Sequence, residues 1–484
     1  MSYIPQQPYP KSAFGDDLDV TLTPKIAIKA VYGVRSDTEQ FVDGGGSGSI
    51  TAVNGEFILQ TGTSAGGYAT LWSRRPLVYI PGVGAECRIT GRFTAGVATS
   101  LQAVGMFSAI NGMFFGYNGT SFGVMHRYGG ALEIRTLTIT AASSAATTAT
   151  VTLNGTAYSG LAVTNAGGDT TLTAHEITVA LEATAAVNAW NIQHIGSTII
   201  FQYKGAGAQS GSYSLAFTAG TGAGTFAQNK AGAAPTETWT AQASWNVSTA
   251  SWFDPTMGNL FKLEYAFLGY GPLKYSIFNP DTRDWELVHS VDWANANTSA
   301  NFNNPSMRPG WVSASLGSTT NLTVAGASAM AALQGDNTIR RPFAISGTQS
   351  GVTTQTQILT VAVRYEFNDR TLNGILNPRF LSLASDSSKS TIFKVFRNPT
   401  VSGTTVHQYV DEDESIAIYD TGGTTISGGR ALGTFLVGAG GGAVIDLTKE
   451  NIELIAGDEI VITGQVVSGA ASELTASLVW EEKI

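Results

Sequence analysis

One segment of the chain has the spacing of a nucleophilic serine. Gly119-Thr120-Ser121-Phe122-Gly123 matches the pattern GxSxG, in which the serine occupies a sharp turn between a strand and a helix. Here the dipeptide Asn118-Gly119 comes first and favours a β-hairpin, and no helical pattern follows the serine. We therefore expect Ser121 to lie in a hairpin, and we predict no catalytic residue and no cofactor-binding residue anywhere in the chain.

Three carboxylates are the second group of candidate catalytic residues. Glu264, Asp284 and Glu286 could converge in space. Retaining glycosidases need two carboxyl groups about 5 Å apart, and sequence spacing does not show such a distance. No ExDxxE run, which would place carboxylates close together on one strand, is present. A hydrolase of cell-surface polysaccharides is therefore kept as the second alternative function.

Side chains that bind metals are spread along the chain. The five histidines are far apart in sequence, and none belongs to a motif with metal-ligand spacing. They are His126, His175, His194, His289 and His407. We expect them to be surface histidines or hydrogen-bonded core histidines.

The densest run of charge is Asp411-Glu412-Asp413-Glu414. Its carboxylates could bind Ca²⁺, but we favour a solvated face or a partner for basic residues on a neighbouring subunit. From Asn398 onward there are 13 acidic and 3 basic residues. Eight basic residues lie upstream of that point, at Arg340, Arg341, Arg364, Arg370, Arg379, Lys389, Lys394 and Arg397. We expect this order of charge to favour head-to-tail packing of subunits.

Tryptophans crowd the middle of the chain and leave two interpretations open. They are Trp239, Trp245, Trp252, Trp285, Trp293 and Trp311. Aromatic rings stack on sugar faces in lectin sites, so the group could bind glycans on a host surface. Large aromatic side chains also bury much area in a core, and we favour that interpretation.

Composition narrows the class of protein. Charged residues make up 13% of the 484-residue chain and hydrophobic residues 43%, a balance that favours strands with Thr- and Ser-rich faces over helices. The net charge of −9 argues against nucleic-acid binding, which needs clustered Lys and Arg. Cys87 cannot form a disulfide within the chain. We expect neither a secretory signal nor a membrane span.

The composition changes along the chain and predicts four parts. Residues 1–30 read as an extended arm with three early prolines. Residues 31–135 and 236–334 read as one sandwich split by an inserted α+β domain at 136–235, and residues 335–484 as a C-terminal β-sandwich. The insert holds the one predicted helix, because Thr173-Ala174-His175-Glu176 reads as a capping box and Ile177 follows at helical spacing.

Two Asn-Gly pairs predict hairpins. Asn54-Gly55 and Asn118-Gly119 each lie between stretches of strand-forming residues. Asn-Gly supplies the two positive φ angles that a type I′ turn requires. Further strands are predicted at 87–93, 261–268, 273–278, 459–462 and 474–480, and a short helical turn at 446–450.

Several segments resemble known proteins. Lys11-Ser12-Ala13-Phe14-Gly15, residues 111–124 and Tyr270-Gly271-Pro272-Leu273-Lys274-Tyr275-Ser276-Ile277 resemble phage virion proteins with a concanavalin-like jelly-roll sandwich. The insert, with residues 151–158 and 197–201, resembles a small module of phage tail and baseplate proteins. The resemblance implies a fibre, spike or decoration role.

These observations lead to one expected function and two alternatives. We expect a virion structural protein, a surface-displayed component of a capsid or tail that contacts the host, without enzymatic activity. Its expected partners are copies of itself, with a trimer favoured, other virion proteins and host-surface glycans, with no nucleic acid and no membrane. The alternatives are a carbohydrate-binding host adhesin and the polysaccharide hydrolase.

Overall fold

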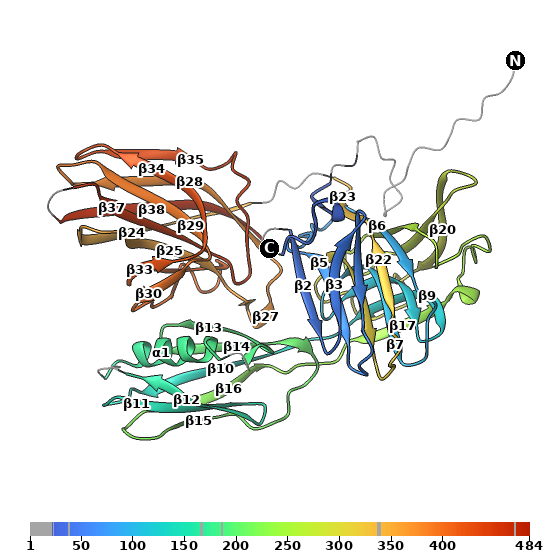
Figure 1. Cartoon of the computed structure of the whole chain (residues 1–484), viewed down its shortest axis with the longest axis horizontal. Coiled ribbons are helices and arrows are strands. Elements are labelled where there is room, and N and C mark those ends of the chain that lie inside the picture. The colour runs from blue at the N-terminus through green and yellow to red at the C-terminus, as the bar shows by residue number, and fades with distance from the viewer. Residues whose placement is uncertain are drawn as a thin grey trace, which may run out of the picture. The chain divides into compact units, whose positions relative to one another are not determined.

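The computed structural model describes residues 22, 24–36, 39–164, 168–184, 187–335, 340–468 and 471–484. The chain forms two compact units, each built from two stretches of sequence (Figure 1). The first unit combines Met1–Gly130 with Ala234–Thr338, and the second combines Ala131–Ala233 with Ile339–Ile484. The fold is mainly β, and all strand pairings of the described residues are antiparallel.

The first unit is a sandwich of a nine-stranded and a seven-stranded sheet. The larger sheet runs in the order β20 (Asp284–Val291), β19 (Leu273–Asn279), β18 (Asn259–Tyr265), β6 (Ala85–Phe93), β22 (Thr323–Gly326), β4 (Glu56–Gln60) and β3 (Ser49–Val53), with β23 (Ser328–Leu333) on β6 and β1 (Ile26–Lys29) on β23. The smaller sheet runs in the order β17 (Thr236–Ala241), β9 (Ser121–Tyr128), β8 (Gly112–Asn118), β7 (Ser100–Phe107), β21 (Arg308–Ser315), β5 (Tyr68–Ser73) and β2 (Gln40–Gly45). Two short 3-10 helices, Ala30–Tyr32 and Gln242–Ser244, complete it.

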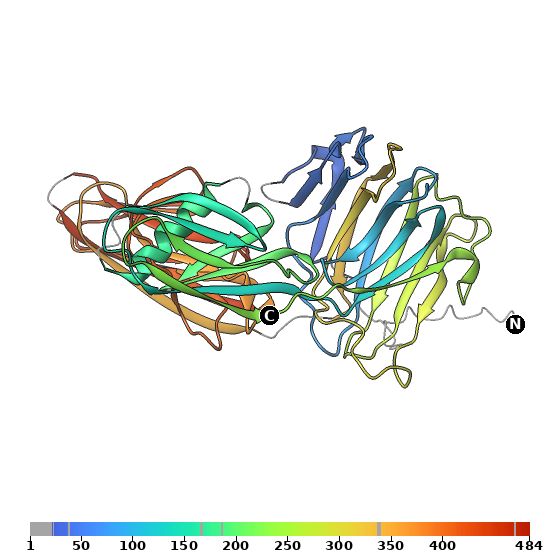
Figure 2. The ribbon, with the colours of Figure 1, turned by 90° about the horizontal axis from the view of Figure 1, so that it is seen from below.

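The core of this sandwich follows from alternation along its strands. Successive side chains of a strand point to opposite faces, so Phe261, Leu263 and Tyr265 of β18 share one face and are fully buried. They pack against residues of the facing sheet such as Phe115 and Trp311. In Figure 2 the strands of this unit run in similar directions, as expected for two aligned sheets.

In the second unit, the inserted part combines one helix with two small sheets. The four-stranded sheet is β13 (Trp190–Ile195), β14 (Thr198–Ala206), β10 (Leu132–Ala141) and β16 (Ala223–Lys230), and the three-stranded sheet is β12 (Thr156–Val163), β11 (Thr147–Leu153) and β15 (Ser214–Phe217). Helix α1 spans Thr170–Glu182. Its buried residues Ala174, Ile177 and Leu181 join the core of the insert.

The C-terminal part of the second unit is another sandwich. One sheet is β24 (Arg341–Val352), β38 (Ser472–Lys483), β28 (Ile375–Ser385) and β35 (Gly442–Asp446), with β36 (Leu454–Ile455) on β28. The other is β31 (Gln408–Tyr409), β32 (Ala417–Asp420), β25 (Thr356–Val363), β37 (Glu459–Val466), β29 (Thr391–Arg397) and β34 (Arg430–Val437). Two short ladders pair β26 (Glu366–Phe367) with β27 (Arg370–Thr371) and β30 (Thr400–Gly403) with β33 (Gly423–Ser427). The fully buried Trp480 and Phe393 belong to the core.

The mainly β architecture, the split sandwich and the helix of the insert agree with the sequence analysis, but the predicted arm is too long. Ile26–Lys29 is a strand, with Ile26 opposite Ala331 of β23. Ile26 and Ile28 are buried in the core of the sandwich. Residues 1–21 and 23 lie outside the described residues, so the rest of the arm prediction, and the stretch Lys11–Gly15, stay untested.

The boundaries of the insert also shift. The second unit begins at Ala131 and returns at Ala233, whereas the composition suggested 136 and 235. Strand β10 starts at Leu132, and its first three residues, Leu132, Glu133 and Ile134, are all buried. A composition change marks where the residue types differ, and the chain crosses between the units a few residues earlier.

Both Asn-Gly hairpins exist, but only one has the predicted turn. Asn54 and Gly55 have φ of 54° and 80° and join paired residues Val53 and Glu56, as a type I′ turn requires. At the second hairpin Asn118 still pairs with Ser121. The turn is therefore Gly119-Thr120, with positive φ at Gly119, which is the arrangement of a type II′ turn.

The predicted capping box is wrong, although the helix forms. The N-cap is Asp169, whose Oδ1 accepts hydrogen bonds from the amides of Thr171 and Leu172. Thr173 lies inside the helix, and its hydroxyl donates to the carbonyl of Asp169. Thr and Glu three apart also occur inside a first turn, so that pattern alone does not locate the cap. Similarly, the segment after Asp446 forms a hydrogen-bonded turn and not a helical one.

Candidate functional site

The outer face of the seven-stranded sheet carries the strongest candidate binding surface. A second apolar cluster, separate from the core of the sandwich, lies on that sheet. It consists of Ala103, Phe107, Phe114 and Met125, with Trp72, Trp239 and Val312 packed against it. On β7, Val104 and Met106 point to the core while Ala103 and Phe107 belong to this second cluster. We call this surface the aromatic face.

The strand register lines up one residue from each of the seven strands. Trp239 lies opposite Met125, and Met125 opposite Phe114. The row continues through Gly105 and Gly310 to Trp72 and Phe41. The glycines at the centre are closely packed, and Phe107 contacts the rings of Trp72 and Phe114 on this face. Trp72 and Trp239 are only half-buried, so flat rings remain accessible on this face.

Arginines border the aromatic face. The guanidinium carbon of Arg74 lies 5.0 Å from the centre of the Phe41 ring, and that of Arg127 lies 5.0 Å from the centre of the Phe114 ring. Arg308 also lies over Phe41. Burial, and then the neighbouring Arg74, lower the pKa of Arg308 to about 10, so this side chain stays charged at neutral pH. Phe107, Phe114 and Met125 are buried on this face, and Arg127 is paired with Glu237. The rings that could stack on a sugar are therefore those of the half-buried Phe41, Trp72 and Trp239.

The tryptophans singled out in the sequence do not form one cluster. Trp245, Trp293 and Trp311 are buried, as the core interpretation expects. Trp239 belongs to the aromatic face, while Trp285 lies on the other sheet with Arg88 and Lys262 over its ring. Sequence reasoning missed Trp72 and Phe41, which lie far upstream. The cross-strand register unites them with Trp239, and register is not visible in the sequence.

The three candidate carboxylates do not form a catalytic pair. Glu264 lies opposite Lys274 and Glu286 opposite Ile277. Lys274 and Ile277 are three residues apart on β19, so the two glutamates point to opposite faces of the sheet. Hydrogen bonds from Ser248, Asn279 and Trp252 lower the pKa of Glu286, and a carboxyl group with a lowered pKa does not suit a general acid. Asp284 is exposed.

Ser121 lies at the start of β9, directly after the β8–β9 turn. The GxSxG segment therefore enters a strand, as expected, and not a helix. Its backbone cannot present the serine as a nucleophile elbow does.

Three of the five histidines come together, which their separation in the sequence did not indicate. The rings of His175 and His194 have centres 5.2 Å apart, and so do those of His194 and His407. They come from α1, from β13 and from the segment before β31, so only the tertiary fold unites them. His126 packs among Tyr128, Trp293 and Phe302, and His289 lies near Tyr275. These last two are core histidines, as expected.

The acidic run forms a turn that is exposed to solvent. The Asp411 carboxylate accepts hydrogen bonds from the amides of Asp413 and Glu414. All four acidic residues of the run are exposed. Among the described residues, no group of three or more His, Cys, Asp or Glu side chains is arranged to hold a metal ion. The solvated interpretation of this run is the one that the geometry favours.

Most of the basic residues upstream pair with acidic residues of the same chain. Five of them form ion pairs within the chain. The pairs are Arg340–Glu481, Arg341–Glu414, Arg364–Glu366, Arg379–Glu481 and Arg397–Asp458. Antiparallel strands bring the first and last thirds of this sandwich side by side, so the basic and acidic residues mostly meet inside one subunit. The charge order therefore gives no support to head-to-tail packing.

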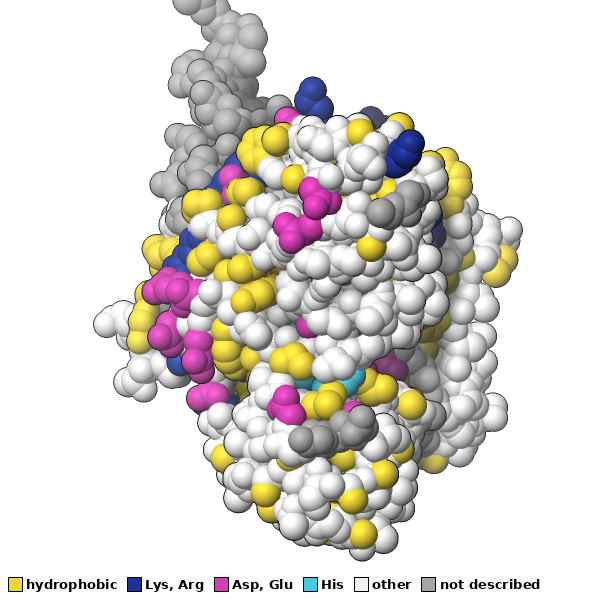
Figure 3. Space-filling view, turned by 90° about the vertical axis from the view of Figure 1, so that its left-hand side faces the viewer, with side chains coloured by type: hydrophobic (Ala, Val, Ile, Leu, Met, Phe, Trp, Pro, Cys, Tyr) yellow, Lys and Arg dark blue, Asp and Glu magenta, His cyan; other side chains and the backbone are white. Residues whose placement is uncertain are grey.

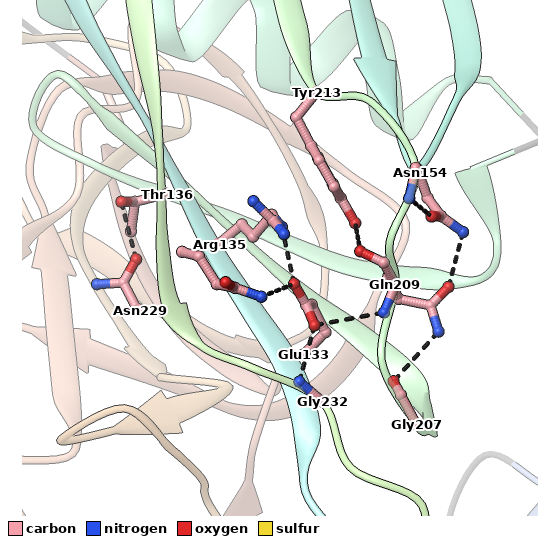
Figure 4. A network of polar contacts seen from close by, with 11 residues as sticks. Glu133, Arg135, Thr136, Asn154, Gly207, Gln209, Tyr213, Asn229 and Gly232 are labelled. Carbon is pink, nitrogen blue, oxygen red and sulfur yellow. Dashed lines mark hydrogen bonds and ion pairs between the residues drawn. The ribbon is translucent and has the colours of Figure 1, made fainter.

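A buried ion pair fixes the base of the insert (Figure 4). Glu133 of β10 has no exposed surface and accepts hydrogen bonds from Arg135 Nε, Gln228 Nε2 and the amide of Gly232. The guanidinium of Arg135 also lies over the ring of Tyr213, 3.7 Å from its centre. Every donor belongs to the insert, and Gly232 precedes the return of the chain to the first unit. The network therefore has a structural role: it holds β10 to the segment that ends at Gly232.

Cys87 is fully buried, and burial raises the pKa of its thiol, so a reactive thiolate is disfavoured. No helix in the described part of the chain is long and apolar enough to span a membrane.

Comparisons with known proteins give only weak likenesses. No family model and no curated protein matches the chain. A solved structure of an archaeal virus, described by its triple jelly-roll fold and turret assembly, is 7% identical, covers 97% of this chain and 98% of its own, and has a TM-score of 0.18. Infectious bursal disease virus Gx strain is 10% identical over 85% of this chain and 79% of its own, with a TM-score of 0.17. The VP2 subviral particle of that virus is 9% identical over 84% and 78%, with a TM-score of 0.14. These scores are too low to support an argument, so function is argued below from this chain's own residues.

Proposed function

We propose that this chain is a structural protein displayed on the surface of a virus particle, as a fibre, spike or decoration component of a capsid or tail. It assembles with copies of itself, with a trimer favoured, contacts other virion proteins and touches the host surface. It has no catalytic function. The observation that carries this proposal is an exposed apolar flank on the C-terminal sandwich.

The flank consists of β34, β35 and the adjoining part of β28. Leu436 of β34 is 67% exposed, Val444 of β35 is 74% exposed and Phe380 of β28 is 44% exposed. Val444 lies opposite Ser382, two residues from Phe380, so Val444 and Phe380 are neighbours on one face. Leu436 precedes the buried Val437 and lies opposite Ile392, on the outer face of the other sheet. Val444 and Phe380 therefore form the apolar group on this face, and apolar side chains grouped on a surface mark an interaction site more often than scattered ones do.

Both sheets end at this flank. Among the described strands, β34 pairs only with β29 and β35 only with β28, and residues 438–441 connect them directly. Proteins that stay monomeric protect such edges with lysine, proline or inward-pointing charges. Arg430 and Asp446 lie at the far ends of β34 and β35, and the remaining residues of both strands are uncharged. A second copy of the chain, which presents the same uncharged edges, is the partner that this flank fits.

Solution mass measurement with a matched pair of variants tests the assembly. Val444→Glu places a charge on the flank, and Val53→Glu places one at another exposed valine, in the β3–β4 hairpin of the first unit. We expect an oligomer at micromolar concentration for the unmodified chain and for Val53→Glu, and a smaller species for Val444→Glu. A stable monomer of the unmodified chain would contradict self-assembly.

A carbohydrate-binding adhesin is the second candidate function, and the aromatic face is the observation that favours it. Half-buried tryptophan rings and bordering arginines are suited to sugars, especially acidic ones. The hydrolase alternative receives no such support, because Glu264 and Glu286 point to opposite faces of their sheet. Incubation of the purified chain with host-surface glycans, followed by analysis of chain length, is expected to leave the glycans intact.

A further inference from the structure

The insert and the C-terminal sandwich, which together form the second unit, meet along a small seam. Its apolar part consists of Ile134, Ile195, Ile200, Ala362 and Ile418, with Tyr409 packed against them. Polar contacts also cross it: among them, the amide of Gly196 donates to the carbonyl of His407 over 2.9 Å, and Gln202 Nε2 donates to the carbonyl of Tyr365 over 3.0 Å. With so few apolar contacts, the polar groups of the seam have a large influence on whether it stays closed.

The three clustered histidines lie in this seam. His175 and His194 come from the insert, and His407 comes from the sandwich. The hydroxyl of Thr405 lies 3.1 Å from His175 Nδ1, and the carbonyl of Thr405 accepts from His194 Nε2 over 2.9 Å. Both ring nitrogens of His407 are buried and have no hydrogen-bond partner among the described residues. Figure 3 looks onto this unit and shows histidine side chains near its middle with acidic side chains close by.

The surroundings keep these rings neutral. Burial, with smaller contributions from His407 and His175, lowers the pKa of His194 to about 3. Burial also lowers the pKa of His175 and of His407, although Asp420 opposes the shift at both and Glu176 opposes it at His175. The Asp420 carboxylate accepts hydrogen bonds from the amides of Val406 and Gly422 and from Gln357 Nε2. The Asp420 carboxylate is therefore held by hydrogen bonds within the sandwich, and it compensates the positive charge of a protonated histidine only in part.

Two carboxyl groups at the seam respond to pH in the opposite sense. Burial raises the pKa of Glu459, at the start of β37, to about 7, with smaller contributions from Glu182, Asp420 and Asp458. Burial also raises the pKa of Glu182, at the end of α1, to about 7. The Glu182 side chain keeps much of its exposed surface, so we expect a smaller rise there. When both carboxyl groups ionise above pH 7, they repel each other across the seam.

We propose that the seam between the insert and the C-terminal sandwich is a pH-gated joint, closed near neutral pH and opened by acid through His175, His194 and His407. In the open state the histidines regain solvent and take up protons near pH 6.5, whereas in the closed state they cannot. Each histidine therefore shifts the equilibrium toward the open state by up to about tenfold for each pH unit below 6.5.

The carboxyl groups set the pH at which opening begins. Between about pH 7 and pH 4.5 the closed state takes up protons on Glu459 and Glu182, which offsets much of the histidine effect. Below about pH 4.5 the carboxyl groups are protonated in both states, so the histidines act alone and opening becomes steep. Above pH 7 the ionised carboxylates weaken closure again. The seam is thus most tightly closed between about pH 4.5 and pH 7.

Hydrogen exchange of the full chain tests the joint, with rates corrected for the intrinsic effect of pH. Peptides that cover residues 190–203 and 403–409 report the seam, and β11 in the core of the insert is the internal reference. We expect seam protection to fall at least tenfold between pH 6 and pH 4 while β11 stays protected. His407→Phe removes one titrating ring without removing a hydrogen bond, so it should retain about tenfold more seam protection at pH 4.

Further variants separate the possible outcomes. Glu459→Gln should keep the acid opening and lose the weakening above pH 7. If His407→Phe does not fold, His194→Gln, which keeps a donor for Thr405, takes its place with the same expectation. Equal loss of seam protection in the unmodified chain and the histidine variant would overturn the proposal. Zn²⁺ that protects the seam of the unmodified chain at pH 7, but not that of His407→Phe, would also overturn it, because the histidines would then be a metal site.

Discussion

Glu133 and Arg135, two residues apart on β10, form an ion pair of 2.8 Å in which the carboxylate has no exposed surface. Both side chains point into the base of the insert, where Gln228 and the Gly232 amide supply further donors (Figure 4). A buried charge of this kind is tolerated only while its partners stay in place. The pair therefore ties strand β10 to the segment that leads out of the insert.

Removal of one partner of this pair should be costly. We expect Arg135→Ala to lower the free energy of unfolding of the insert by about 3–5 kcal/mol, because Glu133 is left buried with too few donors. The matched control is Arg92→Ala, which breaks the more exposed pair Arg92–Glu56 and should cost about 0–1 kcal/mol. Urea unfolding measures both. Equal costs at the two sites would show that burial of Glu133 has no energetic consequence.

The start of α1 gives a second test. Asp169→Ala removes the N-cap and should destabilise the insert by about 1 kcal/mol. Thr173→Val removes the hydroxyl that donates to the Asp169 carbonyl but keeps the backbone hydrogen bond from the Thr173 amide to that carbonyl, so it should have a smaller effect. Helix content by circular dichroism and thermal unfolding of both variants provide the measurement. If the Thr173 variant were the more damaging, the capping box predicted from the sequence would be right and the cap at Asp169 wrong.

His126 should make the first unit sensitive to acid. Burial among aromatic rings lowers its pKa to about 4, against about 6.5 in an unfolded chain. The unfolded state therefore binds the proton first, and stability is lost as the pH falls from 6.5 to 4, by about 3 kcal/mol. His126→Gln keeps a donor for the Asn301 carbonyl and should show a shallower pH dependence.

Tryptophan fluorescence is a suitable probe for that comparison, because seven of the nine tryptophans lie in the first unit. They are Trp72, Trp239, Trp245, Trp252, Trp285, Trp293 and Trp311. Urea unfolding at pH 7 and pH 4.5 should show the largest difference between the unmodified chain and the variant at the lower pH. If the unmodified chain and His126→Gln lose the same amount of stability between pH 7 and pH 4.5, protonation of His126 has no effect on the free energy of unfolding.

The aromatic face predicts where a glycan would bind. Titration with acidic host-surface glycans should change tryptophan fluorescence in the unmodified chain, and Trp72→Ala or Trp239→Ala should weaken binding at least tenfold. Trp285→Ala, on the other sheet of the same sandwich, is the control and should bind normally. No change in the unmodified chain would remove the adhesin alternative and leave the structural function without a sugar ligand.

Local signals in the sequence located the strands and hairpins well. Asn54-Gly55 specifies its turn because both positive φ angles fall on the residues that tolerate them. Asn118-Gly119 specifies a hairpin but not its turn. When the turn is shifted by one residue, Gly119 still supplies the positive φ angle that the first turn position requires. Ile26 and Ile28 were read as part of an arm, because a four-residue edge strand with prolines before it gives little periodicity.

The surfaces and clusters could not be predicted, because they depend on which strands become neighbours. Trp72 and Trp239 are 167 positions apart and share a row only through the sheet order. His175, His194 and His407 were expected to be surface or hydrogen-bonded core histidines, because no short motif unites them. The paired charges of the C-terminal sandwich show the same limit: their order along the chain suggested contacts between subunits, and antiparallel pairing places the partners within one subunit.

We propose that this chain is a structural component on the surface of a virus particle. An electron-microscopy map of whole particles, purified from cells that produce the protein, is the decisive measurement. We predict density on the outside of the particle that fits both units, with copies in contact through β34 and β35. Purified particles that lack the chain, or that hold it only as a dispersed internal protein, would contradict the account.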